Sequence, residues 1–154
     1  MQWQQLTLVS VERLRCGNGG EYVPGKLSEF CKKNGIIQEL TTPYTPELNA
    51  VSERMNRTLV EQAQSMLAEA NLPKSMWGDA IMTAVYLTNR SPTAAVPGIT
   101  PFELWYGHKP DLSRLRVFGA PAVVHVPKER RQKLDSTGIS AILIGYDING
   151  YRLW

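Results

Sequence analysis

Cysteine and histidine are scarce in this sequence, with two residues of each type. Cys16 and Cys31 are 15 positions apart and form no CxxC pair. Together with His108 and His125 they do not match the ligand spacing of a structural zinc site, so we expect no zinc-dependent fold. We expect both cysteines to be reduced, buried thiols of an intracellular protein.

Long apolar runs are also missing, because no segment approaches the roughly 20 apolar residues that a membrane-spanning helix needs. The N-terminal residues 1–5 have neither the basic start nor the apolar stretch of a secretion signal. We therefore expect a nuclear or cytoplasmic protein that is not secreted and has no membrane partner. The 43% of hydrophobic residues and 20% of charged residues are typical of a globular domain.

The positive charge is concentrated in the C-terminal third of the chain. Residues 1–107 contain nine Lys/Arg and ten Asp/Glu, whereas residues 108–154 contain eight and four. The densest basic run is KERRQK at residues 128–133. Such a run is usually a solvated loop and less often a patch that contacts phosphates, and charge alone leaves both interpretations open.

Hydrophobic patterning predicts alternating strands and helices in the first part of the chain. A strand is expected over Leu6–Leu14, followed by a glycine-rich turn at residues 16–20. A helix over Lys26–Asn34, with Gly35 as its C-terminal cap, leads to a short strand over Ile36–Leu40.

Two longer helices are expected next. The first runs from Glu47 to about Ala70, and Pro73 opens the second, which ends before Ser91-Pro92. Each helix has an apolar stripe at helical spacing. The stripes consist of Leu48, Val51, Met55, Leu59, Ala63, Met66, Leu67 and Ala70, and of Trp77, Ile81, Ala84, Val85 and Thr88.

The last third of the chain has a different pattern. Thr100 and Pro101 are typical of a helix N-cap and first helical position, so we expect a short helix through Trp105. We therefore predict an α/β domain over residues 1–108 and a truncated small β-barrel or sheet over residues 109–154. The strands of the second domain are expected over Leu115–Phe118, Ala122–Val126, Ile139–Tyr146 and Tyr151–Trp154.

One acidic residue, Glu53, stands near the start of the long helix, with Arg57 one turn later. By helix geometry alone the two would form a surface ion pair worth roughly a few tenths of a kcal/mol. Two further features favour a chemical role. Thirty-five residues separate Glu53 from Gly17, which follows the first predicted strand, and distinctive motifs surround both positions.

The motifs are LRCGNGGEY at residues 14–22 and PYTPELNAVSERMNRT at residues 43–58. They strongly resemble the integrase of copia-type long-terminal-repeat retrotransposons. The resemblance covers about 140 residues and continues through Leu72–Trp77, Tyr86–Pro92, Thr100–Trp105, Leu115–Gly119 and Gly145-Tyr146.

The resemblance implies a ribonuclease-H-like fold and an active site of two aspartates and one glutamate, with 35 residues between the last two. In such a site three carboxylates hold two divalent ions, Mg²⁺ or Mn²⁺, which activate the nucleophile and stabilise the leaving oxygen. It makes Glu53 the third carboxylate, as catalytic residue and metal ligand. It makes Gly17 the position of the second aspartate.

This sequence departs from the pattern of the family at that second position. Gly17 has no side chain, and residues 1–16 contain no aspartate, so the first aspartate is expected upstream of this chain. The neighbours Asn18 and Glu21 carry oxygen atoms but are out of register. Because one carboxylate cannot hold two dications against water, we expect no stably bound metal and no enzyme activity in the chain as it stands.

The resemblance also implies that the helix bearing Glu53 lies along nucleic acid. Arg57 would face phosphate there, with Arg54 and Asn56 beside it. The C-terminal strands resemble the Src-homology-3-type barrel that follows the integrase core. This adds four phosphate-binding candidates, Lys128, Arg130, Arg131 and Lys133, and the expected partners are DNA or RNA and other integrase subunits.

We predict a nucleic-acid-binding remnant of an integrase that has lost catalysis. A fragment of an active integrase is one alternative, and a co-opted interaction or scaffolding module is another. Because the central strands of the family would precede this chain, we expect the apolar stripes of both long helices to be partly uncovered. The isolated chain would then be marginally stable or dependent on a partner.

Overall fold

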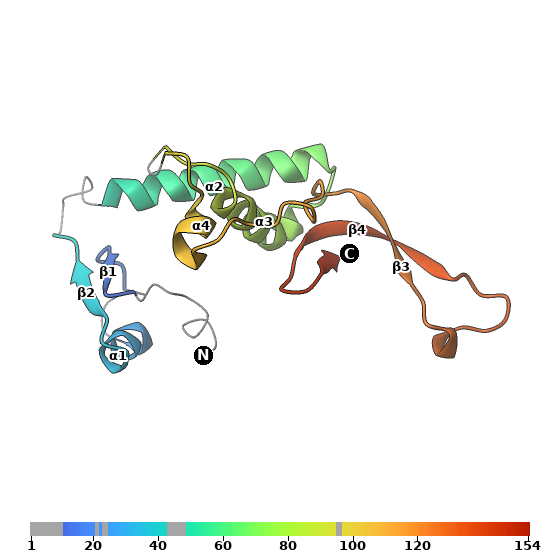
Figure 1. The fold of residues 1–154 in the computed structure, drawn as a ribbon, viewed down its shortest axis with the longest axis horizontal. Coiled ribbons are helices and arrows are strands. Elements are labelled where there is room, and N and C mark those ends of the chain that lie inside the picture. Colours follow the sequence, from blue (N-terminus) through green and yellow to red (C-terminus); the bar gives the residue numbers. More distant parts are fainter. Residues whose placement is uncertain (1–10, 21, 23–24, 43–48, 95–96) are drawn as a thin grey trace. The chain divides into compact units, whose positions relative to one another are not determined.

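A computed structural model of the chain describes residues 11–20, 22, 25–42, 49–94 and 97–154. The chain divides into two compact units, residues 1–57 with 105–107 and residues 58–104 with 108–154 (Figure 1). The long helix α2 (Ala50–Glu69) contributes residues to both units. The domain boundary expected at residue 108 remains a prediction.

The first unit contains a parallel strand pair with a helical crossover. Strand β1 (Arg13–Cys16) pairs with β2 (Ile37–Leu40) along its whole length, and α1 (Lys26–Lys33) connects them. Parallel neighbours need such a crossover because a tight turn can join only antiparallel strands. Helix α1 ends where Gly35 adopts a φ of 68°, so the predicted C-terminal cap is confirmed.

In the first unit, side chains of β1 are buried or form ion pairs with β2. Cys16 on β1 and Cys31 on α1 are buried free thiols, as expected. Arg13 donates a hydrogen bond of 2.6 Å to Glu39 on β2, and this bond is the main reason why the pKa of the Glu39 carboxyl lies below its usual range. Arg15 lies 3.5 Å from the other oxygen of the same carboxylate and lowers that pKa further.

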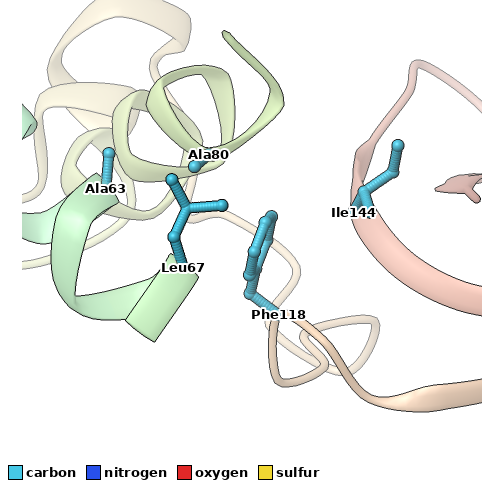
Figure 2. Close-up of a cluster of buried hydrophobic side chains, with 5 residues drawn as sticks. All are labelled: Ala63, Leu67, Ala80, Phe118 and Ile144. Atoms are coloured by element: carbon cyan, nitrogen blue, oxygen red, sulfur yellow. The ribbon is translucent and has the colours of Figure 1, made fainter. Parts of the chain in front are cut away.

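The second unit packs the C-terminal part of α2 against α3 (Trp77–Asn89), which a 3₁₀ turn, η2 (Lys74–Met76), introduces. The helix predicted after Pro73 is therefore confirmed. Its buried cluster combines both helices with two residues from the C-terminal third, and Leu67 lies beside Phe118 in Figure 2. The cluster consists of Ala63, Leu67, Ala80, Phe118 and Ile144.

A three-stranded antiparallel sheet completes the second unit, in the order β3 (Pro121–His125), β4 (Gly138–Tyr146) and β5 (Tyr151–Leu153). The three strands lie within one residue of their predicted bounds. The buried Thr83 hydroxyl on α3 donates to the Ile144 carbonyl at 3.2 Å, which fixes the helix to the middle strand. A 2.6 Å ion pair between Asp79 and Arg152 joins α3 to β5.

The strand predicted over Leu115–Phe118 is wrong, because this segment forms no ladder. Its backbone is held by a side chain instead. The Tyr146 hydroxyl accepts a hydrogen bond of 2.9 Å from the Arg116 N–H and donates one of 2.6 Å to the Arg116 carbonyl. The Tyr146 ring also stacks on Tyr86 of α3, with centroids 4.1 Å apart. A phenol that satisfies both backbone groups of one residue leaves nothing there for a neighbouring strand.

The short helix α4 (Pro101–Tyr106) begins as predicted from its capping residue. Thr100 Oγ1 accepts a hydrogen bond of 3.1 Å from the Glu103 N–H, which would otherwise be unpaired in the first turn.

Replacement of Thr100 with alanine is expected to lower the free energy of unfolding by about 1 kcal/mol, because the cap is lost. Urea unfolding followed by circular dichroism measures the change. Thr100→Ser keeps the hydroxyl and is expected to lose much less. Equal losses for the two variants would contradict a capping role.

Some predictions concern residues that the structure does not describe. The strand expected over Leu6–Leu14 lies largely outside the described residues, and β1 begins at Arg13 and ends at Cys16. The expected helix start at Glu47 also lies outside them, and α2 is described from Ala50.

Much of the predicted apolar stripe on α2 is exposed. Val51 is 73% exposed and Met55 46%, whereas burial begins at Ala63. On α3, Trp77 is 66% exposed. The expectation of partly uncovered stripes is thus confirmed for these residues. Within the described parts of the chain, no helix is long and apolar enough to cross a membrane.

Candidate functional site

Glu53 lies in the first turn of α2, and its side chain is exposed. Arg57 follows one turn later and is exposed as well. Among the described residues the ion pairs are Arg13–Glu39, Arg15–Glu39 and Arg152–Asp79, and none of them includes Glu53. The surface ion pair with Arg57, which was the simplest explanation for Glu53, is therefore not formed.

Position 17 lies beside the start of the same helix. Gly17 directly follows β1, and a Cβ atom at this position would lie 3.7 Å from Asn49 Nδ2, an ordinary van der Waals distance. Asn49 directly precedes α2 and stands four residues, about one helical turn, before Glu53. Position 17 therefore lies beside Asn49, which precedes the helix that carries Glu53, and a shared role of the two positions stays a prediction.

The described residues around Gly17 do not supply the ligands of a two-metal centre. Gly17 has no side chain, and the Asn18 amide donates a hydrogen bond of 2.6 Å to the Thr41 carbonyl. Glu21 lies outside the described residues. In the part of the chain that is described, no group of three His, Cys, Asp or Glu side chains could hold a metal ion. Glu53 is therefore a lone carboxylate in the described site.

Three polar side chains near Glu53 are available for contact with phosphate. Arg54, Asn56 and Arg57 are all exposed on α2. Arg54 and Arg57 are three positions apart, which makes them neighbours on the helix surface. Neither forms an ion pair with any described residue, so both guanidinium groups are free to bind an anion.

The second basic group lies on the 12-residue loop between β3 and β4. A hydrogen bond of 3.0 Å from the Val126 N–H to the Thr137 carbonyl closes the base of this loop. The short 3₁₀ helix η3 (Lys128–Arg130) lies within it, at the far end of the hairpin in Figure 1. The four predicted phosphate-binding residues, Lys128, Arg130, Arg131 and Lys133, all belong to this loop, and all except the half-buried Arg131 are exposed.

The loop cations have no side-chain partner among the described residues, unlike other arginines of the second unit. Arg116 donates hydrogen bonds to two backbone carbonyls, and Arg152 pairs with Asp79. The Arg114 guanidinium lies 6.0 Å from the centre of the Tyr151 ring. Among the described residues, none of the four loop cations has an ion pair. The structure therefore places four cations without ion pairs in this loop, together with the two carboxylates of Glu129 and Asp135.

One feature of the loop was not foreseen from the sequence. Leu134 is 96% exposed and directly follows Lys133. The next residue, Asp135, accepts a hydrogen bond of 2.7 Å from the Gln132 N–H. No sequence pattern distinguishes Leu134 from a core leucine, because exposure depends on how the loop is closed.

Comparison with known proteins identifies relatives of this chain. The retrovirus-related Pol polyprotein from transposon TNT 1-94 of Nicotiana tabacum is 50% identical over 146 residues, which are 94% of this chain and 11% of the polyprotein. The corresponding polyprotein from transposon RE1 of Arabidopsis thaliana is 37% identical over 131 residues, or 85% of this chain and 9% of the polyprotein. The homologues of the present chain are thus copia-type, retrovirus-related Pol polyproteins. The resemblance seen in the sequence motifs is thereby confirmed.

The chain spans about a tenth of the length of these polyproteins. A shorter relative, the uncharacterized mitochondrial protein AtMg00710 of Arabidopsis thaliana, is 44% identical over 71 residues, which are 46% of this chain and 59% of that protein. Residues 120–154 match the retroviral polymerase SH3-like domain. The SH3-type character predicted for the C-terminal strands is therefore confirmed.

A solved structure shares the fold of this chain. The simian T-cell lymphotropic virus intasome in complex with PP2A regulatory subunit B56 gamma contains a chain that matches with a TM-score of 0.51 and 18% identity. The match covers 92% of this chain and 54% of that chain. At this identity the match shows the fold alone: a mixed α/β architecture.

Proposed function

We propose that this chain is a nucleic-acid-binding part of a retrotransposon integrase, with an active site that is incomplete. The proposal assigns β1 to α4 to a partial ribonuclease-H-like core. It includes contacts with DNA or RNA, assembly with other integrase subunits, and a nuclear or cytoplasmic location.

Topology supports the assignment to an integrase core. In the parallel β1–α1–β2 unit, position 17 directly follows the carboxyl end of β1, and α2 begins beside it. Functional side chains in α/β folds gather at the carboxyl ends of parallel strands. Position 17 lies at such an end, beside Asn49 at the start of α2, and the solved structure with a matching chain is that of an intasome.

The site supports binding better than catalysis. A two-metal reaction needs several carboxylates around two ions that lie about 4 Å apart. The described site offers Glu53 alone, and position 17 carries no side chain. We therefore assign no resident Mg²⁺ or Mn²⁺ to this chain and no strand-transfer or nuclease activity.

The observation that carries the binding proposal is the set of unpaired cations on the β3–β4 loop. Lysine and arginine side chains that neutralise phosphates release condensed counterions, so binding weakens as the salt concentration rises. Four such contacts give a slope of about −3 to −4 in a plot of log affinity against log salt concentration. The charge is local, because the whole chain carries a net charge of only +3.

Replacement of the four loop cations with glutamine is expected to remove most of the affinity for duplex DNA. The unaltered chain should lose about 100-fold in affinity between 50 and 200 mM salt, and the variant should lose this salt dependence almost entirely. Fluorescence anisotropy with a labelled duplex, repeated over a salt series, measures both quantities. The substitutions are Lys128→Gln, Arg130→Gln, Arg131→Gln and Lys133→Gln.

Charge-matched pairs provide the control for this experiment. The pair Arg130→Gln and Lys133→Gln lowers the net charge by two, as does the pair Lys32→Gln and Lys33→Gln in the exposed last turn of α1. Only the loop pair is expected to reduce the salt slope. Equal effects of the two pairs would show that overall charge governs binding, and absence of binding at low salt would refute the nucleic-acid proposal.

A second candidate function, a protein-interaction module, is favoured by one further observation. The C-terminal half of α2 and the start of α3 line a groove of about 580 Å³ that includes the exposed Trp77 and Val60. Exposed apolar surface of this kind can mark a site of protein–protein interaction. Salt-dependent DNA affinity distinguishes the two functions, because an apolar protein contact does not follow the salt slope.

A further inference from the structure

Leu134 stands apart from every other exposed apolar residue that the structure describes. Its exposed fraction of 96% exceeds that of Ile148 at 76% and Val123 at 75%. Exposure of a single leucine on a monomer is common, so exposure alone assigns nothing. Its position matters more, because it lies on the same loop as four unpaired cations.

The loop holds Leu134 in a defined conformation. The Asp135 carboxylate accepts the Gln132 N–H on one side, and the Asp135 N–H donates to the Gln132 carbonyl at 3.1 Å. This closed turn contains Lys133 and Leu134 at its centre. The carboxylate of Asp135, the next residue in the sequence, is therefore hydrogen-bonded within the loop.

We propose that the β3–β4 loop binds duplex DNA through its minor groove, with the cations on backbone phosphates and Leu134 in the groove. The inference rests on the proposed nucleic-acid-binding function and names the residue that makes the apolar contact. The minor groove of duplex DNA is about 6 Å wide, about half the width of the major groove. The same groove brings the phosphates of both strands close to an inserted side chain.

Physical chemistry explains why an apolar residue belongs beside the cations. Phosphate contacts position a protein on DNA, whereas groove contacts add affinity that does not depend on salt. Leucine is among the side chains that proteins insert into the minor groove. Burial of its side chain contributes about tenfold in affinity when it is removed from water.

The test compares two exposed apolar residues at opposite ends of β4. Leu134→Ala is expected to weaken binding of the full chain to an A·T-rich duplex about tenfold at every salt concentration, with an unchanged salt slope. Ile148→Ala is the matched control. Ile148 lies on the β4–β5 turn, roughly 25–30 Å along the nine-residue β4 from the loop, and should bind within about twofold of the unaltered chain. Netropsin, which occupies the minor groove, should compete with the unaltered chain.

The outcomes test the groove contact of Leu134 and the nucleic-acid-binding function separately. If the unaltered chain binds duplex DNA and Leu134→Ala binds equally well, the groove contact is refuted and the nucleic-acid proposal stands. If the unaltered chain does not bind at low salt, both are refuted. Loss of self-association in Leu134→Ala, measured by sedimentation velocity without DNA, would assign the residue to a contact between copies instead. Tighter binding to anionic vesicles than to DNA would also overturn the inference.

Discussion

Replacement of Gly119 with alanine is expected to lower the free energy of unfolding by about 3 kcal/mol. Gly119 has a φ of 82°, which is unfavourable for residues with a side chain. A Cβ atom there would lie 2.3 Å from Ala70 Cβ and 3.1 Å from Ala70 Cα. Neither neighbour can rotate away, because one is backbone and the other is attached directly to it.

The surroundings of Gly119 explain why the clash cannot be relieved cheaply. The Gly119 N–H donates to the Leu143 carbonyl at 2.8 Å, and the preceding Phe118 is buried in the core cluster. A shift of this backbone would therefore disturb both β4 and the contact of Phe118 with the α2–α3 pair. Domains of this size have total stabilities of about 5–15 kcal/mol, so a loss of this magnitude removes a large share.

Gly98 provides a matched control for the Gly119 substitution. Its φ is 79°, but a Cβ atom at this position meets nothing within 4 Å. Gly98→Ala is therefore expected to cost about 1 kcal/mol, which is the backbone strain alone. Urea unfolding of both variants isolates the steric part as the difference. Adding Ala70→Gly to Gly119→Ala should recover part of that difference, and equal losses for Gly98→Ala and Gly119→Ala would refute the close approach.

The sequence predicts those elements of the fold whose signals are local. Patterning located α1, α2, α3 and the three C-terminal strands because their apolar periodicity and capping residues are local. The Thr100 cap and the Gly35 cap are of this kind, and both are confirmed. The error at Leu115–Phe118 arose from a contact across 30 residues, since the Tyr146 hydroxyl occupies the Arg116 backbone. Sequence periodicity contains no information about such a pairing.

The candidate site was predictable only in part. The family resemblance paired Gly17 with Glu53, and the structure shows position 17 beside Asn49, one helical turn before Glu53. The basic run at residues 128–133 was visible in the sequence, but its lack of structural partners was not. That property depends on where Asp79, Tyr151 and the carbonyls near Arg116 lie, because these groups engage the other arginines of the second unit.

Replacement of Gly17 with aspartate is expected to create a site for one divalent ion. The position tolerates a side chain, because its Cβ would lie at van der Waals distance from Asn49 and its φ is not left-handed. A carboxylate there would lie near Asn49, one helical turn before Glu53, and two acidic oxygen ligands suit Mn²⁺ or Mg²⁺. Titration with Mn²⁺, followed by paramagnetic broadening of amide signals, should show binding at about millimolar concentration.

Two matched variants test whether the new ligand acts together with Glu53. Gly17→Asn has nearly the same shape without the charge and should not bind Mn²⁺. Adding Glu53→Gln to Gly17→Asp should abolish binding, since a single carboxylate competes poorly with water for a dication. Broadening that persists in this double variant would place the ion elsewhere.

DNA strand transfer is expected in none of these proteins, because one ion cannot both activate the attacking hydroxyl and stabilise the leaving oxygen. Mg²⁺-dependent strand transfer by the unaltered chain, abolished by Glu53→Gln, would show instead that other oxygens complete the site around Glu53.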